Sequence, residues 1–395
     1  MTAAAGSSRQ NPYVVVGAGA QGLTFALGLA RRGLPVILCE RSGVLGGQAR
    51  SFRYGRFTFD FGLHAFVTKS RPVEDFVRGI LGDDFASFYP RAASHWGGDK
   101  LVEDSSSWRV QNLHRRLYAL LPKASGREWS CMRISKPPKT IYPKRGGFGA
   151  IFELMGRELK RSGGQILLET PMEARDFSFA GRRLTHVSVA GKKIPVRGCY
   201  WSAGRPFAAR AGKRPGNAAG RPRDVLLLCH FLAHGRAPLP YHWVRLPESG
   251  GPLLPPLAYY PARFSRDNAP PGHYSVGATT PILATLKNRR LGSLSGWIKS
   301  DPAIFLKPTL NYLVRLGLIR PGDVIKSFAE AVALPPLAQA SARASAPKFD
   351  NFWQAPDFAV HSPEESGVSM QIESAFRALD AALLTSPRAA PHKAG

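Results

Sequence analysis

Residues 13–22 read Tyr13-Val14-Val15-Val16-Gly17-Ala18-Gly19-Ala20-Gln21-Gly22, a strand-forming run that leads directly into a Gly-x-Gly-x-x-Gly turn. Apolar residues then recur at helical spacing through Ala30, and a second apolar run, Val36–Cys39, ends at Glu40. Strand, glycine turn, helix, strand and acid follow one another as in a dinucleotide-binding βαβ unit. The glycines permit a tight turn and let a diphosphate approach backbone amides at the helix N-terminus. We therefore expect the diphosphate to contact Gly17, Ala18, Gly19, Ala20, Gln21 and Gly22.

The acid that ends the second strand indicates which nucleotide fits. Glu40 stands where a carboxylate accepts hydrogen bonds from an adenosine ribose, and its charge would repel a 2′-phosphate. The neighbouring Arg41 keeps a phosphorylated nucleotide open as an alternative. We expect both residues at the ribose end of the site.

The segment after this acid resembles a known motif. Gly46-Gly47-Gln48-Ala49-Arg50-Ser51 is similar to the Gly-Gly-x-x-Arg-Ser element of the flavoprotein superfamily that includes amine oxidases, phytoene desaturases and protoporphyrinogen oxidases. The resemblance implies that the dinucleotide is FAD. Two glycines expose amides to a phosphate, and an arginine adds a charge-assisted contact. The cofactor contacts implied here are Gly46, Gly47, Gln48, Arg50 and Ser51.

Asp60-Phe61-Gly62-Leu63-His64 resembles a stretch found in part of the same superfamily, where the chain passes under the flavin. The resemblance implies that Gly62 lies at the cofactor. His64 is the candidate catalytic residue, because a histidine there could hydrogen-bond the isoalloxazine or a substrate. Packing against apolar neighbours is the alternative role for His64.

Later segments carry the resemblance more weakly. A helix pattern over 151–159 and a strand over 165–168 resemble the return to the nucleotide domain, with Met172 where valine usually packs near adenine. Tyr200-Trp201-Ser202-Ala203-Gly204 resembles a strand whose small residues border the cofactor, which implies a contact for Ala203.

The C-terminal helix pattern begins after Ser366-Gly367 and places Met370 in its first turn. The resemblance implies that this helix points its positive N-terminal end at the flavin pyrimidine ring, near Met370. Before it stands Gln354-Ala355-Pro356-Asp357-Phe358, where the superfamily commonly has Ala-Gly-Asp. Asp357 is carried over as a cofactor contact, although Pro356 cannot donate an amide to a phosphate.

The remaining sequence predicts a second lobe. Residues 177–196 read as a three-strand meander, and 225–232, 257–260 and 274–278 read as strands of a second sheet. Helices are expected over 284–299 and 304–316, the latter broken at Pro308, while the basic stretch 205–223 reads as a linker. We expect an α/β fold in which a Rossmann-type FAD-binding domain (1–68, 140–204 and 347–386) is interleaved with an α+β substrate domain (69–139 and 205–346), followed by a tail, 387–395.

Composition limits the function. The 395 residues include 54 Lys and Arg against 27 Asp and Glu, a net charge of +27, yet no nucleic-acid-binding motif accompanies the excess. The excess of positive charge has three interpretations: an anionic or lipid-like substrate, peripheral contact with an anionic membrane, or an arginine-rich background without function. His230 and His234 lack the glutamate of a His-Glu-x-x-His motif, so no metal is expected. Four scattered cysteines and no apolar span or signal favour a cytoplasmic protein.

Together these features predict an FAD-dependent oxidoreductase that oxidises a C–N or C–C bond of a small molecule. Two alternatives stay open. One is a flavin-dependent mutase without net redox change, resembling UDP-galactopyranose mutase, whose basic pocket would suit the net charge. The other is a non-catalytic binding protein that keeps the fold.

Overall fold

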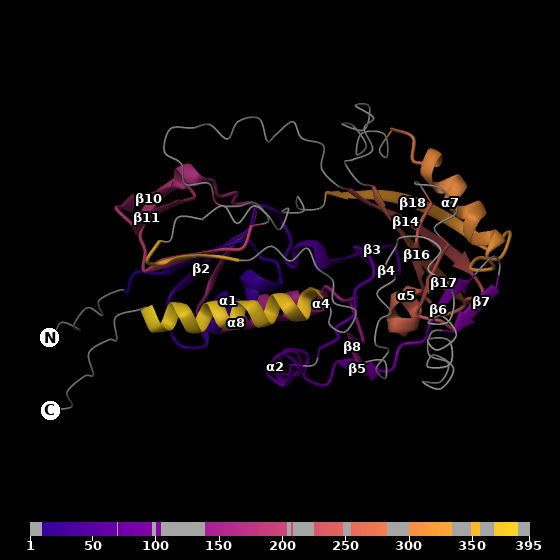
Figure 1. The fold of residues 1–395 in the computed structure, drawn as a ribbon, viewed down its shortest axis with the longest axis horizontal. Coiled ribbons are helices and arrows are strands. Elements are labelled where there is room, and N and C mark those ends of the chain that lie inside the picture. The colour runs from indigo at the N-terminus through magenta and orange to yellow at the C-terminus, as the bar shows by residue number, and fades with distance from the viewer. Residues whose placement is uncertain are drawn as a thin grey trace, which may run out of the picture.

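The computed structural model describes residues 10–68, 70–96, 100–103, 139–203, 207, 225–247, 254–282, 300–333, 349–355 and 367–385. Within them the chain forms two large sheets, one at each end of the molecule in the view of Figure 1. The expected linker at 205–223, apart from Phe207, the helix at 284–299 and Asp357 all lie outside these residues. The domain boundaries that the sequence suggests stay a prediction.

The first sheet is parallel and contains the predicted βαβ unit. Its five strands lie in the order β19-β13-β1-β2-β9. β1 and β2 have the predicted bounds, and all four residues of β1 are buried, because both faces of the sheet are covered. The bounds are β1 Tyr13–Val16, β2 Val36–Cys39, β9 Gln165–Leu167, β13 Gly198–Trp201 and β19 Phe352–Gln354.

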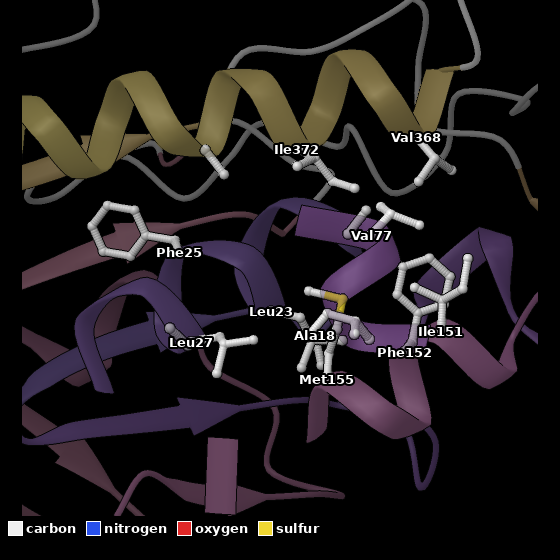
Figure 2. Packing of buried hydrophobic residues seen from close by; sticks show 14 of the residues in the cluster. Ala18, Leu23, Phe25, Leu27, Val77, Ile151, Phe152, Met155, Val368 and Ile372 are labelled. Atoms are coloured by element: carbon white, nitrogen blue, oxygen red, sulfur yellow. The ribbon is translucent and has the colours of Figure 1, made fainter. Parts of the chain in front are cut away.

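Four helices lie on one side of this sheet, with α2 and α8 packed on α1 and α4: α1 Ala20–Ala30, α2 Arg71–Leu81, α4 Ala150–Arg161 and α8 Gly367–Thr385. Figure 2 shows Val368 and Ile372 of α8 pointing toward the core that Leu23 of α1 and Met155 of α4 share. A side-chain carbon at Gly28 would lie 2.4 Å from Leu379 Cδ2, so the glycine lets α1 and α8 pack closely. Helices distant in sequence are thus fixed around the glycine turn.

The predicted three-strand meander covers the opposite face and is confirmed. It consists of β10 Phe177–Ala180, β11 Arg183–Val189 and β12 Lys192–Pro195, preceded by the 3₁₀ turn η2 Ala174–Asp176. Its apolar residues share a core with the sheet residues Val14, Cys39 and Trp201.

The second sheet has seven strands in the order β18-β14-β17-β16-β15-β6-β7. The strands predicted over 225–232, 257–260 and 274–278 are confirmed within β14, β16 and β17. The bounds are β6 Ala92–Trp96, β7 Lys100–Glu103, β14 Val225–His234, β15 Trp243–Arg245, β16 Leu257–Tyr259, β17 His273–Ile282 and β18 Val324–Ala333, with the short α5 Pro261–Phe264 and η5 Arg266–Asn268 between β16 and β17.

Helix α7, Ala303–Arg315, packs on one face of this sheet (Figure 1). The predicted break at Pro308 is wrong, because the helix continues through that residue. Pro308 is exposed, while Phe305, Leu306, Tyr312 and Leu313 on either side of it are buried against the sheet. Burial of both halves of the helix outweighs the backbone hydrogen bond that proline cannot make.

A hairpin joins the two sheets. It is formed by β3, Ser51–Tyr54, and β4, Phe57–Asp60, and lies against the face of the second sheet that α7 leaves open. A second antiparallel pair, β5 Phe85–Phe88 with β8 Thr140–Pro143, lies nearby in Figure 1. The motif residues 46–64 are therefore held between the parallel sheet and the seven-stranded sheet.

Candidate functional site

The glycine turn after β1 has the geometry of an anion cradle. Gly17 has φ +97°, and a side-chain carbon there would lie 3.1 Å from the backbone of Ser202. At Gly22 such a carbon would lie 1.8 Å from the carbonyl oxygen of Gly17, so only glycine fits. At Gly19, in contrast, nothing lies within 4 Å of that position. Two of the three glycines are required by packing, and the third faces open space.

The N-terminus of α1 supports the same use. Gly19 is the N-cap, no side chain caps the helix, and no acidic residue lies in its first turn. The first amides of a helix have no partner within it, and they carry partial positive charge. Ala20 and Gln21 are buried at this end, whereas Gly17 and Gly19 are partly exposed, so the glycine backbone is what an anion could reach here.

The Gly46-Gly47 loop packs directly on this turn. Gly46 N donates to Ala18 O over 2.8 Å, and a side-chain carbon at Gly47 would lie 3.4 Å from Gly19 Cα. Both residues have positive φ, +95° and +57°, which favours glycine. The structure therefore brings together the two motifs that the sequence analysis assigned to one cofactor.

Glu40 faces back toward the turn from the end of β2. Its Oε2 accepts from Ala18 N over 2.7 Å, and its Oε1 accepts from the backbone and hydroxyl of Ser42. A carboxylate offers about four acceptor sites, so these three bonds leave room for one more donor. Arg41 beside it is exposed. The position suits the predicted ribose contact, although protein groups already orient this carboxylate.

Arg50 is half-buried beside the glycine loop. Its guanidinium lies 4.1 Å from the centre of the Phe61 ring and donates to Gly47 O over 3.2 Å. Burial lowers the pKa of Arg50, and the carboxylates of Glu330 and Glu40 partly oppose that effect. A cation in this setting interacts strongly with an anion, because little water screens it.

Glu330 reaches the same region from the second sheet, and sequence reasoning missed it. β3 runs over β18 so that Tyr54 lies near Lys326, with 4.9 Å from ring centre to Nζ, and Phe52 near Phe328, with ring centres 5.8 Å apart. Two residues further along the same faces, the next pair to meet is Arg50, just before β3, and Glu330 of β18. Burial raises the pKa of Glu330, and the charge of Arg50 opposes this shift. A carboxylate of the seven-stranded sheet thus lies near Arg50, beside the Gly46-Gly47 loop.

Ser51 belongs to a buried polar network centred on Asp60. Its hydroxyl donates to Asp60 Oδ1 over 2.5 Å and accepts from Gly149 N. Asp60 also accepts from Tyr142 OH and Phe148 N. Burial raises the pKa of Asp60, while these hydrogen bonds act in the opposite direction and lower it. The Tyr142 hydroxyl in turn accepts from Asn268 Nδ2. The cofactor contact at Ser51 stays a prediction, and its hydroxyl joins the hairpin to the start of α4.

Two tyrosines of this network were also missed, because an isolated tyrosine in a strand carries no motif. Tyr142 and Tyr259 are both fully buried, and burial raises the pKa of each hydroxyl. Tyr259 OH donates to Asp60 O over 3.2 Å. Its ring lies over Gly277, where a side-chain carbon would come within 2.3 Å of it.

His64 holds the motif segment together. Its Nε2 lies 3.1 Å from the carbonyl oxygens of both Gln48 and Phe61. Carbonyl oxygens only accept, so Nε2 carries the proton. The ring also stacks on Phe148, with centres 5.6 Å apart. This geometry gives His64 a positioning role, and its catalytic role stays a prediction.

The other predicted contacts surround the same region. Ala203 N would lie 3.2 Å from a side-chain carbon at Gly17, and Gly62 lies near Leu226 of β14. The chain leading to Met172 runs beside Glu40, because Thr170 N donates to Glu40 O. Met370 lies in the first turn of α8, where Ser369 Oγ donates a 2.6 Å hydrogen bond to Val67 O, three residues after the motif segment 46–64.

Across the described ranges, no group of three or more histidine, cysteine or acidic residues could hold a metal ion. In the same part of the chain, no helix is long and apolar enough to cross a membrane.

The chain is similar to known proteins in part of its sequence and in its fold. Residues 15–80 match the family model of the NAD(P)-binding Rossmann-like domain. No curated protein sequence matches the chain. A solved structure of reduced UDP-galactopyranose mutase is 15% identical, with a TM-score of 0.68 over 95% of this chain and 94% of that chain.

Two other solved structures share this fold. A protein provisionally assigned as a protoporphyrinogen oxidase, from Exiguobacterium sp. 255-15, is 14% identical, with a TM-score of 0.66 over 96% of this chain and 100% of that one. Putrescine oxidase bound to putrescine is 12% identical, with a TM-score of 0.60 over 95% and 99%. At such identities the likeness shows the fold alone. The chain thus carries an NAD(P)-binding Rossmann-like segment within an α/β fold of the amine oxidase and protoporphyrinogen oxidase type, as its motifs predict.

Proposed function

We propose that this protein binds FAD and is an FAD-dependent oxidoreductase that oxidises a C–N or C–C bond of a small molecule. One observation carries the proposal: the Gly46-Gly47 loop packs on the Gly17–Gly22 turn, beside Glu40 and Arg50. This arrangement groups backbone amides for the diphosphate, a carboxylate for the ribose and an arginine for the phosphate, as a flavin dinucleotide requires.

The residues present fit the cofactor. Gly19 offers open space next to uncapped helix amides, which would hold the diphosphate, and Glu40 retains an acceptor site for the ribose. Arg50 would neutralise negative charge on the phosphate and flavin side. Met172 would border the adenine, Ala203 the central part of the cofactor, Gly62 the underside of the flavin, and Met370 the pyrimidine edge of the flavin.

FAD, when bound, supplies the acceptor for the two electrons that leave the substrate. The chain's own groups would position the cofactor and stabilise the charge that develops on it. The N-terminal end of α8 would favour the negative charge that reduction places on the pyrimidine ring. His64, through its two carbonyl bonds, keeps the Gln48 and Phe61 backbones in register under the expected flavin position.

The substrate itself is proposed only by class. A net charge of +27 favours a small molecule that carries an anionic group, and it would also suit peripheral contact with an anionic membrane. Specificity would come from the region beside the hairpin on the face of the seven-stranded sheet opposite α7, where Glu330 lies near Arg50.

An absorption spectrum of the freshly purified protein tests cofactor binding. We expect a flavin spectrum in the wild type, a clear loss of flavin in Arg50→Ala, and no loss in Arg377→Ala, a matched exposed arginine on α8. Anaerobic bleaching by an amine or an unsaturated lipid, with peroxide formed when air is admitted, supports the oxidase.

Other outcomes select the alternatives. Turnover of a nucleotide sugar only after reduction with dithionite contradicts the oxidoreductase and supports the mutase. A colourless protein that gains no thermal stability from added FAD contradicts cofactor binding and supports the non-catalytic binding protein.

A further inference from the structure

Two histidines face each other at one end of the seven-stranded sheet. His234 is the last residue of β14 and His273 the first of β17, and the antiparallel register places them directly opposite each other. A 2.7 Å hydrogen bond from Gly235 N to Gly272 O lies just beyond the pair and fixes the spacing of the two chains. Residues that pair directly across two strands project from the same side of a sheet. Both imidazoles therefore share one side of the sheet.

The distance between the rings matches a shared ligand. Their centres lie 4.8 Å apart and their planes are inclined at 44°, so the rings are not stacked in parallel. An imidazole nitrogen binds Zn²⁺ at about 2.0–2.1 Å, which places two ring centres around one tetrahedral ion about 5 Å apart. The two side chains are thus already at the separation that one metal ion requires.

The proton on His273 is also placed suitably. Its Nδ1 lies 3.0 Å from the carbonyl oxygen of Pro271, and because a carbonyl only accepts, Nδ1 carries the proton. Nε2 is then left with its lone pair. A second ring nitrogen that donates to a carbonyl is the usual arrangement behind a metal-binding histidine. The edge of the Phe57 ring, 5.9 Å away between centres, packs on the His273 ring, and His234 is exposed to solvent.

The geometry points to a two-histidine site at His234 and His273 for one divalent transition-metal ion of the Zn²⁺, Cu²⁺ or Ni²⁺ class. Such ions prefer imidazole ligands. No third protein ligand joins the pair among the described residues, so water would complete the coordination shell. The two histidines flank residues 235–272, which include β15, β16 and α5. A bound ion would tie the two ends of this insertion together and stabilise the sheet.

Cu²⁺ and Zn²⁺ test the site in untagged protein that has been freed of metal with a chelator. Electron paramagnetic resonance of the Cu²⁺ complex should show coupling to two imidazole nitrogens. His234→Gln and His273→Gln should each remove one nitrogen and weaken Cu²⁺ binding about tenfold or more. Zn²⁺ should raise the midpoint of thermal unfolding in the wild type and not in either variant.

His186→Gln, in β11, is the matched control and should bind Cu²⁺ as the wild type does. Because His273 packs against Phe57, His234→Gln decides the outcome if His273→Gln fails to fold. A wild-type spectrum with a single nitrogen, or an unchanged spectrum in His234→Gln, overturns the proposal. None of these readouts depends on FAD.

Discussion

At the scale of single residues, Gly19 and Gly22 separate a packing requirement from a binding requirement. In Gly22→Ala the new carbon would lie 1.8 Å from Gly17 O, so the turn must open, and we expect a loss of about 3 kcal/mol or more in unfolding free energy. Gly19→Ala has open space and an ordinary φ of −76°, so its stability should stay within about 1 kcal/mol of the wild type.

The same Gly19→Ala variant should bind FAD about tenfold more weakly or worse, because its methyl group lies where the diphosphate would approach the backbone. Denaturant unfolding and FAD titration measure the two effects separately. A Gly19→Ala protein that binds FAD as tightly as the wild type would show that the diphosphate does not lie at this turn.

Asp60 is the residue whose loss should damage the junction of the two sheets most. Asp60→Ala leaves Tyr142 OH, Phe148 N and Ser51 Oγ without their acceptor in a buried site. We expect a fall of about 3 kcal/mol in unfolding free energy. Asp75→Ala, which removes an exposed partner of Arg71, should change it by less than about 0.5 kcal/mol. Equal effects in urea unfolding would contradict the role given to this network.

His230 makes the stability of the second sheet dependent on pH. It is fully buried among Phe52, Phe59 and Phe328, and neither ring nitrogen has a hydrogen-bond partner among the described residues. Burial lowers the pKa of His230 from 6.5 to about 3. Between these two values the unfolded chain binds a proton that the folded chain does not, so stability is present above pH 6.5 and is lost as the pH falls.

His230→Leu tests this dependence. The wild type should lose up to about 1.4 kcal/mol per pH unit through this group below its unfolded pKa, and the variant should show a correspondingly shallower fall. Urea unfolding at several pH values measures the slope. His186→Leu, on the meander, should keep the wild-type slope, and parallel slopes for wild type and His230→Leu would refute the assignment.

At the scale of elements, α7 shows packing prevailing over local preference. Pro308 lies inside the helix with its side chain exposed, so replacing it restores a backbone donor without disturbing the buried face. Pro308→Ala should therefore raise the unfolding free energy by about 1–3 kcal/mol. Lys307→Ala, at the exposed neighbouring position, is the control. A destabilised Pro308→Ala would mean that the proline supports the helix.

Strand β18 shows why some elements escaped prediction. Its sequence places Lys326, Phe328 and Glu330 on one face and Ile325, Ser327 and Ala329 on the other, so neither face is consistently apolar. The alternation that marks a half-buried strand is thus absent. Glu330 could not be assigned to the site, because its approach to Arg50 depends on the way the hairpin crosses this strand. β1 and β2, in contrast, lie in a fully covered sheet and read as continuous apolar runs.

At the scale of the whole molecule, the sequence predicted the two-sheet α/β architecture and the pairing of its two glycine motifs. This was possible because the turns that require glycine, and the order of strand, helix and strand around them, are encoded within short stretches of sequence. The network of Asp60, Tyr142 and Tyr259 depends on contacts between segments 82 to 199 residues apart, which no local pattern encodes. The substrate face follows from such contacts as well, so its chemistry could not be derived from motifs.

One titration tests the central claim most directly. FAD-free protein is titrated with FAD, with binding followed by flavin absorbance and calorimetry, beside the Gly19→Ala and Arg377→Ala variants. The account predicts saturable binding of one FAD per chain by the wild type and Arg377→Ala, with clearly weaker binding by Gly19→Ala. Absence of saturable binding to the folded wild-type protein would contradict it.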